Sequence, residues 1–154
     1  MTLDEMLARE AIRHIISVYA NAVDRGGFDE VTATFAKDGI YEPMPGQVLT
    51  DHVQIKQFLS GLARDFGNYA KTSGLTLWLR HQITSSRIEF ETADRAKGWT
   101  SFLAMGPSGL DHAGTYSDRF VHRDERWLFA QRKITIYWYA PTSAIPTALA
   151  SMAT

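Results

Sequence analysis

The second half of this chain reads as long strands joined by very short connections, and this pattern limits the fold more than any other feature. The predicted strands are Leu77 to Glu91, Arg95 to Met105, Leu110 to Arg123 and Arg126 to Tyr139. A parallel pair of strands needs a crossover of a dozen or more residues, whereas a few residues are enough to join antiparallel neighbours. We therefore expect an antiparallel meander.

The first half of the chain is mostly helical. One amphipathic helix is predicted from Leu3 to Asp24, with Gly26-Gly27 as its stop. The other elements predicted before the meander are helices and short strands at Phe28 to Phe35, Ile40 to Glu42, Gln47 to Leu49 and His52 to Arg64. Helices followed by a meander indicate an α+β protein, a cone in which a curved, mainly antiparallel sheet packs on three N-terminal helices. The segment from Pro141 to Thr154 could be a short helix, a lid or an arm onto a neighbouring subunit.

Size and composition limit the class of function. A chain of 154 residues fits one domain, residues 1–154, which is large enough for a core and an internal pocket. The absence of cysteine excludes thiolate metal sites and thiol nucleophiles, and no histidine pair has metal-ligand spacing, so neither a metal nor a cofactor is expected. Charged residues are scattered and the net charge is −1, which indicates a small-molecule substrate rather than nucleic acid or a membrane. Without a membrane-length apolar run or a basic leader, a cytoplasmic location is expected.

Asp24 is predicted to lie in the last turn of the first helix. A carboxylate there meets the negative end of the helix macrodipole, at a cost of about 0.3–1 kcal/mol when it is exposed. Another group should therefore hold this side chain. The alternative is a solvated aspartate that leans on neighbouring Arg25.

His81 is directed to an apolar strand face, because it shares its parity with Leu79 and Ile83. Ile88 has the opposite parity, so a bulge or sharp twist is expected between Thr84 and Arg87, and such a feature can redirect side chains near a site. The alternative for His81 is a core histidine bonded to a backbone carbonyl.

Arg132 is the only charged member of a parity set on the last strand. That set is Leu128, Ala130, Arg132, Ile134, Ile136 and Trp138. A buried arginine must be paired or must face a cavity, so a structural ion pair is the alternative to a pocket role. If the three polar residues meet, Asp24 could orient His81 as a base, and Arg132 could stabilise a developing anion.

The remaining candidates are aromatic and polar side chains that are less specific than this trio. Aromatic residues that could form a pocket wall, with core packing as the alternative, are Tyr19, Tyr41, Trp99, Tyr116 and Trp138. The other histidines are interpreted as surface or structural residues; they are His14, His52, His112 and His122. Asp118 is interpreted as an edge or interface charge.

Several segments together resemble the SnoaL-like branch of the nuclear transport factor 2-like superfamily, which implies the α+β cone fold. They are Leu7-Ala8-Arg9-Glu10-Ala11-Ile12, Tyr19, Val23-Asp24, the His81 strand, Gly114-Thr115-Tyr116-Ser117, and Arg123-Asp124-Glu125-Arg126-Trp127-Leu128-Phe129. Within the branch the chain is most similar to the scytalone dehydratase, hexachlorocyclohexane dehydrochlorinase and bile acid dehydratase group. That group uses an Asp–His dyad, whose positions match Asp24 and His81, and the assisting arginine of the dehydrochlorinase falls on Arg132.

The chain also departs from these enzymes. Tyr19 stands where the dehydrochlorinase carries a lysine, and the second catalytic histidine of scytalone dehydratase has no counterpart on the strand from Trp99 to Met105. The resemblance implies a cofactor-independent lyase, a dehydratase or a dehydrohalogenase, acting on a small apolar, cyclic substrate through the Asp–His dyad. The alternatives are an isomerase or polyketide-cyclase-like enzyme with the same dyad, and a non-catalytic ligand-binding module. The resemblance also implies a homotrimer, with a dimer as the next choice.

Overall fold

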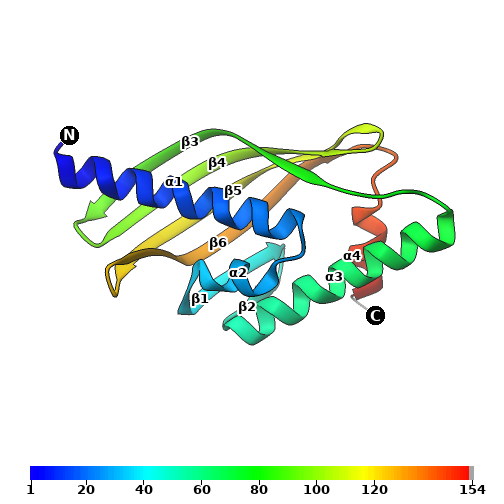
Figure 1. Cartoon of the computed structure of the whole chain (residues 1–154), viewed down its shortest axis with the longest axis horizontal. Helices are drawn as coiled ribbons and strands as arrows, with labels where there is room; N and C mark the ends of the chain where they lie inside the picture. The colour runs from blue at the N-terminus through cyan, green and yellow to red at the C-terminus, as the bar shows by residue number, and fades with distance from the viewer. Residues whose placement is uncertain (153–154) are drawn as a thin grey trace.

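In a computed structural model of the chain, which describes residues 1–152, a curved sheet packs against helices on one face (Figure 1). The helices are α1 (Leu3–Asp24), α2 (Phe28–Ala33), α3 (His52–Ser73) and α4 (Ile145–Met152). The strands are β1 (Phe35–Met44), β2 (Gln47–Leu49), β3 (Arg80–Thr92), β4 (Arg95–Gly106), β5 (Gly109–Arg123) and β6 (Arg126–Tyr139). Their order in the sheet is β2-β1-β6-β5-β4-β3, with β1 and β6 parallel and the other neighbours antiparallel. The predicted α+β class and the meander are confirmed.

The first helix has its predicted bounds, whereas the third is longer than predicted. α1 begins at Thr2, whose side chain accepts a hydrogen bond from the backbone N–H of Glu5. α3 continues from the predicted end at Arg64 to Ser73 and stops at Gly74, which has a left-handed φ of 67°. The apolar face of α3 continues to Phe66, which packs at the interior cavity described below. This packing extends the helix although its last turns contain weak helix formers.

The first strand is also longer than predicted, and the second helix ends earlier. β1 begins at Phe35, which pairs with Phe129 of β6 in the parallel part of the sheet. That partner lies far away in the sequence, so local periodicity carried no sign of it. The predicted bulge on β3 is confirmed, because its pairing with β4 shifts register between Ile83 and Ser86.

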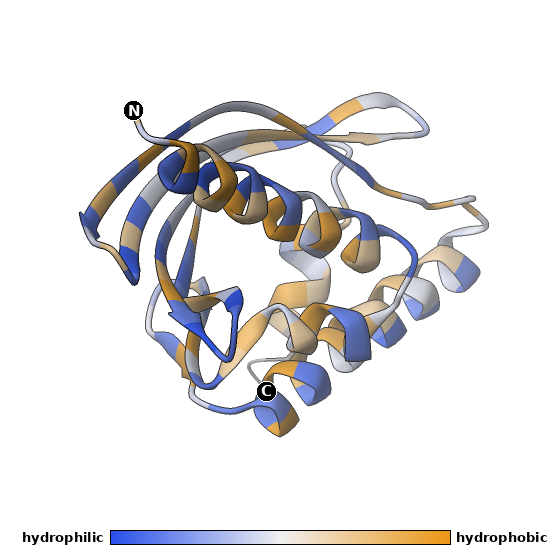
Figure 2. Ribbon diagram, turned by 60° about the vertical axis from the view of Figure 1, so that its left-hand side comes forward, coloured by the Kyte–Doolittle hydropathy of each residue, from blue (hydrophilic) through white to orange (hydrophobic). Residues whose placement is uncertain are grey.

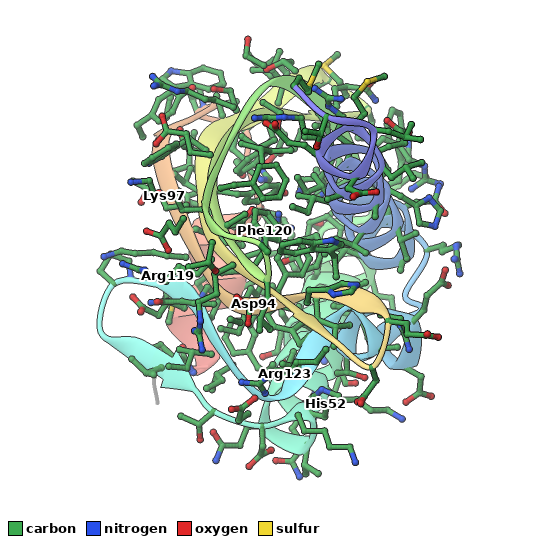
Figure 3. All side chains as sticks on the ribbon, turned by 90° about the vertical axis from the view of Figure 1, so that its left-hand side faces the viewer. His52, Asp94, Lys97, Arg119, Phe120 and Arg123 are labelled. Atoms are coloured by element: carbon green, nitrogen blue, oxygen red, sulfur yellow. The ribbon has the colours of Figure 1, made fainter. Side chains whose placement is uncertain are left out.

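The core lies between the sheet and the helices. Figure 2 shows hydrophobic and hydrophilic residues alternating along α1, whose buried positions include Ile12 and Ile16. Figure 3 shows the same division across the sheet, with Lys97 and Arg119 on its outer face and Phe120 directed toward the helices. None of the helices in the described part of the chain is long and apolar enough to cross a membrane.

The C-terminal tail, which the sequence left open among three forms, contains a short helix. This helix, α4, packs against α3. The last two residues of the predicted tail, 153–154, lie outside the described residues.

Candidate active site

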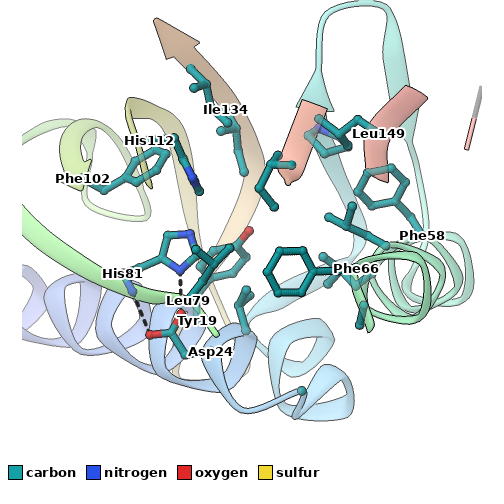
Figure 4. A pocket seen from close by; sticks show the side chains of 18 of the residues that line it. Tyr19, Asp24, Phe58, Phe66, Leu79, His81, Phe102, His112, Ile134 and Leu149 are labelled. Atoms are coloured by element: carbon teal, nitrogen blue, oxygen red, sulfur yellow. Dashed lines mark hydrogen bonds and ion pairs between the residues drawn. The ribbon is translucent and has the colours of Figure 1, made fainter. Parts of the chain in front are cut away.

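A cavity of about 360 Å³ lies between the sheet and the helices α1, α3 and α4. Phe58 and Phe66 of α3 and Leu149 of α4 form an apolar wall opposite the polar side chains (Figure 4). The polar end is formed by Tyr19 and Asp24 of α1, His81 of β3 and residues described below. An apolar ligand with one polar, reactive end fits this division.

Asp24 and His81 meet at the polar end of the cavity, where α1 ends and β3 begins. Oδ1 of Asp24 lies 2.6 Å from Nδ1 of His81, and Oδ2 accepts the backbone N–H of the same residue at 2.9 Å. An ionised carboxylate can only accept, so Nδ1 carries the hydrogen and Nε2 of the neutral ring is the basic atom. The side chains are only 11% and 13% exposed. The expected contact is therefore present, and it fixes the tautomer of the ring.

Arg25 does not hold the Asp24 carboxylate. The Arg25 guanidinium bonds instead to Asn21 and to Glu30. Arg80 donates to the backbone carbonyl of Asp24 at 3.1 Å, which partly satisfies the open C-terminal end of α1. His81 therefore supplies the partner that the position of Asp24 in the helix required.

Two tyrosine hydroxyls share one hydrogen bond at the cavity wall. Tyr19 and Tyr41 lie 2.8 Å apart, oxygen to oxygen, and both are buried. Burial raises the pKa of Tyr41 well above its ordinary value. Burial also raises the pKa of Tyr19, although the positive charge of the nearby Arg132 opposes this shift. Both hydroxyls therefore stay protonated at neutral pH. One proton bridges the pair, which leaves the other available to a ligand.

Arg132 lies behind the cavity wall and does not line it. Its side chain is fully buried, and Nε and Nη2 donate to Asp118 at 2.8 and 2.7 Å. The guanidinium carbon sits 4.2 Å from the ring centre of Tyr19 and 4.1 Å from that of Tyr116, within cation–π range. Burial by itself would lower the pKa of Arg132, but the neighbouring Asp118 carboxylate outweighs burial, and the pKa of Arg132 is raised. The interpretation of Asp118 as an edge or interface charge is wrong, because β5 is a central strand and this carboxylate is buried.

His112 of β5 lines the cavity beside His81. The two ring centres are 5.7 Å apart, and Nδ1 of His112 lies 2.7 Å from the Asp111 carboxylate. Burial lowers the pKa of His112, as does neighbouring His81, while Asp111 opposes the shift. Two histidines therefore line the polar end of the cavity, and each is bonded to a carboxylate through Nδ1.

A family model for the SnoaL-like domain matches residues 4–133. The chain belongs to the SnoaL-like domain family. This match confirms the resemblance inferred from the sequence motifs. A comparison with curated proteins found no match.

Solved structures share the fold of this SnoaL-like chain at low sequence identity. A candidate scytalone dehydratase from Novosphingobium aromaticivorans has a TM-score of 0.73 and 20% identity over 91% of each chain. A hexachlorocyclohexane dehydrochlorinase from Novosphingobium barchaimii has a TM-score of 0.76 and 19% identity, covering 93% of this chain and 95% of its own. A Mycobacterium tuberculosis protein of unknown function has a TM-score of 0.78 and 18% identity, covering 96% of this chain and 95% of its own.

Three of the five aromatic candidates in this SnoaL-like chain line the cavity, namely Tyr19, Tyr41 and Tyr116. The prediction for Trp99 and Trp138 is wrong, since both lie outside the cavity and are 41% and 42% exposed. Trp99 has the opposite parity to its inward-facing neighbours on β4. Trp138 is turned outward because a bulge at Tyr137 shifts the pairing of β5 with β6.

His112 is the site residue that sequence reasoning missed. It was interpreted as a surface or structural residue because it lies near a strand end. Parity could have found it, since His112 and Tyr116 are four residues apart on one strand and share a face. Its carboxylate partner could not have been found in this way, because adjacent strand residues normally point to opposite faces.

Proposed function

We propose that this SnoaL-like chain is a cofactor-independent lyase that removes a proton and an adjacent leaving group from a small, apolar, cyclic substrate. The contact between Asp24 and His81 at the polar end of an otherwise apolar cavity carries this proposal. His81 acts as the base through Nε2, and Asp24 orients the ring and stabilises the imidazolium that forms. A positioned base of this kind contributes about 10²–10⁴ in rate.

Histidine is a weak base, so it removes a proton from carbon most readily where the negative charge that develops is stabilised, as it is next to a carbonyl group. The free hydroxyl proton of the Tyr19–Tyr41 pair can donate to the enolate oxygen that develops. Arg132 acts on the same charge through Tyr19, since its guanidinium lies against that ring and makes the phenol a stronger donor. This indirect role replaces direct contact between Arg132 and the leaving anion.

The test uses small β-hydroxy ketones that carry a ring, each paired with its β-chloro counterpart. The first pair is the aldol adduct of benzaldehyde and acetone and the chloride with the same skeleton, because both yield benzylideneacetone, whose conjugated absorbance is easily followed. We expect the wild-type protein to accelerate elimination and His81→Ala to lose at least about 10²-fold of the rate.

The matched control is His14→Ala, which changes an exposed histidine on α1 and should leave the rate unchanged. The lyase proposal fails if His81→Ala and His14→Ala have equal rates, or if the wild-type protein accelerates no member of the panel.

A further inference from the structure

His81 and His112 belong to one row across the sheet. In the register of the strands, His81 of β3 pairs with Ala104 of β4, which in turn pairs with His112 of β5. Residues directly opposite each other on neighbouring strands point to the same face. The methyl group of Ala104 leaves the space between the two histidines open, so the rings approach to 5.7 Å and both face the cavity (Figure 4).

A bulge gives His112 its own carboxylate. Leu110 and His112 pair with the adjacent residues Met105 and Ala104, so Asp111 is the extra residue on β5. The bulge redirects Asp111, and its carboxylate lies 2.7 Å from Nδ1 of its neighbour. Nδ1 of His112 is thereby occupied, and Nε2 has no hydrogen-bond partner in the described part of the chain. The arrangement repeats that of Asp24 and His81.

The C-terminal segment holds this second pair in place. Oγ of Ser143 donates to the Asp111 carboxylate at 2.9 Å, and the backbone N–H of Ala140 donates to the Asp111 carbonyl at 2.7 Å. α4 begins two residues after Ser143, and its Ile145 and Leu149 line the cavity. The segment that covers the cavity is therefore the one that positions Asp111.

We propose that His112 is a second catalytic residue that donates a proton to the leaving oxygen, with Asp111 and Ser143 as positioning residues. The proposal rests on the lyase function proposed above and deepens it, because it makes the leaving group a hydroxyl rather than a halide. Hydroxide is a poor leaving group until it is protonated, whereas chloride departs as an anion.

The charges around the cavity agree with this assignment. Arg132 is enclosed behind the wall, and the exposed Arg80 donates to the backbone carbonyls of Asp24 and Leu79. No other arginine or lysine of the described residues lines the cavity. Arg80 is therefore the one arginine or lysine of the described residues at the cavity, and its Nη1 is already bonded to backbone carbonyls. A leaving hydroxyl would find a proton donor in the ring of His112.

The proposed step uses the form in which His112 carries the proton and His81 does not. Because burial lowers the pKa of His112, this is the minority form at neutral pH. Nε2 of His81 takes a proton from the carbon next to the carbonyl, and that electron pair forms the enolate and then the C=C bond. The C–O bond breaks, its electron pair goes to the oxygen, and the oxygen takes the Nε2 proton of His112 and leaves as water. His81 then returns its proton to His112 through solvent in the emptied cavity.

The titratable groups that face His112 include His81, which opposes a second positive charge beside its own ring. They are Asp111 on β5, His81 on β3 and Tyr139 on β6, whose ring lies 5.9 Å from that of His112. Burial lowers the pKa of His112, so its protonated form is a stronger acid than a free histidine. Water elimination should therefore decline as pH rises above the pKa of His112, whereas chloride elimination needs only the neutral base and should not.

The test compares the two paired ketones in the same protein preparation. In His112→Gln, water elimination should fall at least about 10²-fold and chloride elimination less than about 3-fold. Ser143→Ala should reduce water elimination by a smaller factor, about 3- to 10-fold, with kcat changed more than KM. The ratio of the two rates within one variant is independent of the fraction of protein that is folded.

Failure of this inference is distinct from failure of the proposed lyase. Equal losses of both reactions in His112→Gln, or a wild-type protein that eliminates only chloride, would overturn the acid role and leave the lyase in place. A wild-type protein that accelerates neither reaction would overturn both. The acid role would also be contradicted if water elimination and chloride elimination depended on pH in the same way.

Discussion

Two carboxylate pairs, Asp24–His81 between α1 and the sheet and Asp118–Arg132 within the sheet, have similar contact distances and different surroundings. The Asp118–Arg132 pair is 0% exposed, with aromatic rings against the guanidinium. The Asp24–His81 pair lies at the cavity, and the second ring nitrogen is left for a ligand. The distance between partners does not separate a structural pair from a candidate reactive pair. What separates them is whether the pair keeps an atom that can meet a substrate.

Replacing Arg132 should have the largest effect on stability. Arg132→Leu leaves Asp118 as an unpaired buried carboxylate, so the free energy of unfolding should fall by about 3–5 kcal/mol in urea titrations. The control is Arg119→Leu, which removes an exposed arginine paired with Glu91 and should change stability by less than about 1 kcal/mol.

The double variant Arg132→Leu with Asp118→Leu sharpens this comparison. Replacing a buried ion pair with apolar side chains is often neutral or stabilising, so the double variant should recover most of the loss. A double variant as unstable as Arg132→Leu alone would show that the pair is needed for more than mutual neutralisation.

Replacing Asp24 should have the opposite profile, with a large effect on rate and a small one on stability. Asp24→Asn should slow elimination from the benzaldehyde–acetone adduct by about 10²–10³-fold, because the amide neither fixes the tautomer nor stabilises the imidazolium. The free energy of unfolding should fall by only about 1 kcal/mol. The matched control is Asp29→Asn, on an exposed aspartate paired with Lys56. A loss of stability as large as that of Arg132→Leu would show that Asp24 mainly holds the fold together.

The pair of Asp111 and His112 should show the smallest effect, visible as a pH dependence of stability. The pKa of His112 is lowered by burial from an ordinary value of 6.5, so the unfolded chain binds more protons in the window below 6.5. Stability should therefore decline as pH falls through that window. His112→Gln should reduce this decline between about pH 7.5 and about pH 5.5, while His14→Gln should not. Equal declines in both variants would contradict the lowered pKa.

The main framework could be predicted from local patterns in the sequence. α1 has its predicted bounds because its periodicity, its cap at Thr2 and the glycines after Asp24 all act within a few residues. The meander could be predicted for the same reason, since short connections allow only antiparallel neighbours. Asp24 and His81 could be selected because each carries a polar group where its own element disfavours one.

Tertiary structure decided which side chains of β6 face inward. Bulges at Ala130 and Tyr137 change the parity of β6 twice, so the predicted face is correct for Arg132, Ile134 and Ile136 but not for Trp138. Such bulges depend on the register with the neighbouring strand, which strand periodicity alone cannot supply.

The second histidine pair shows this division most clearly. The sequence by itself determined that His112 shares a strand face with Tyr116. Only the folded chain placed it beside His81, through the register across Ala104, and joined Asp111 to Ser143 from the far end of the chain. Local patterns determine the elements and their faces because backbone hydrogen bonds, capping and side-chain alternation act between residues that are close in the sequence. Contacts between distant segments determine which of those faces form a site.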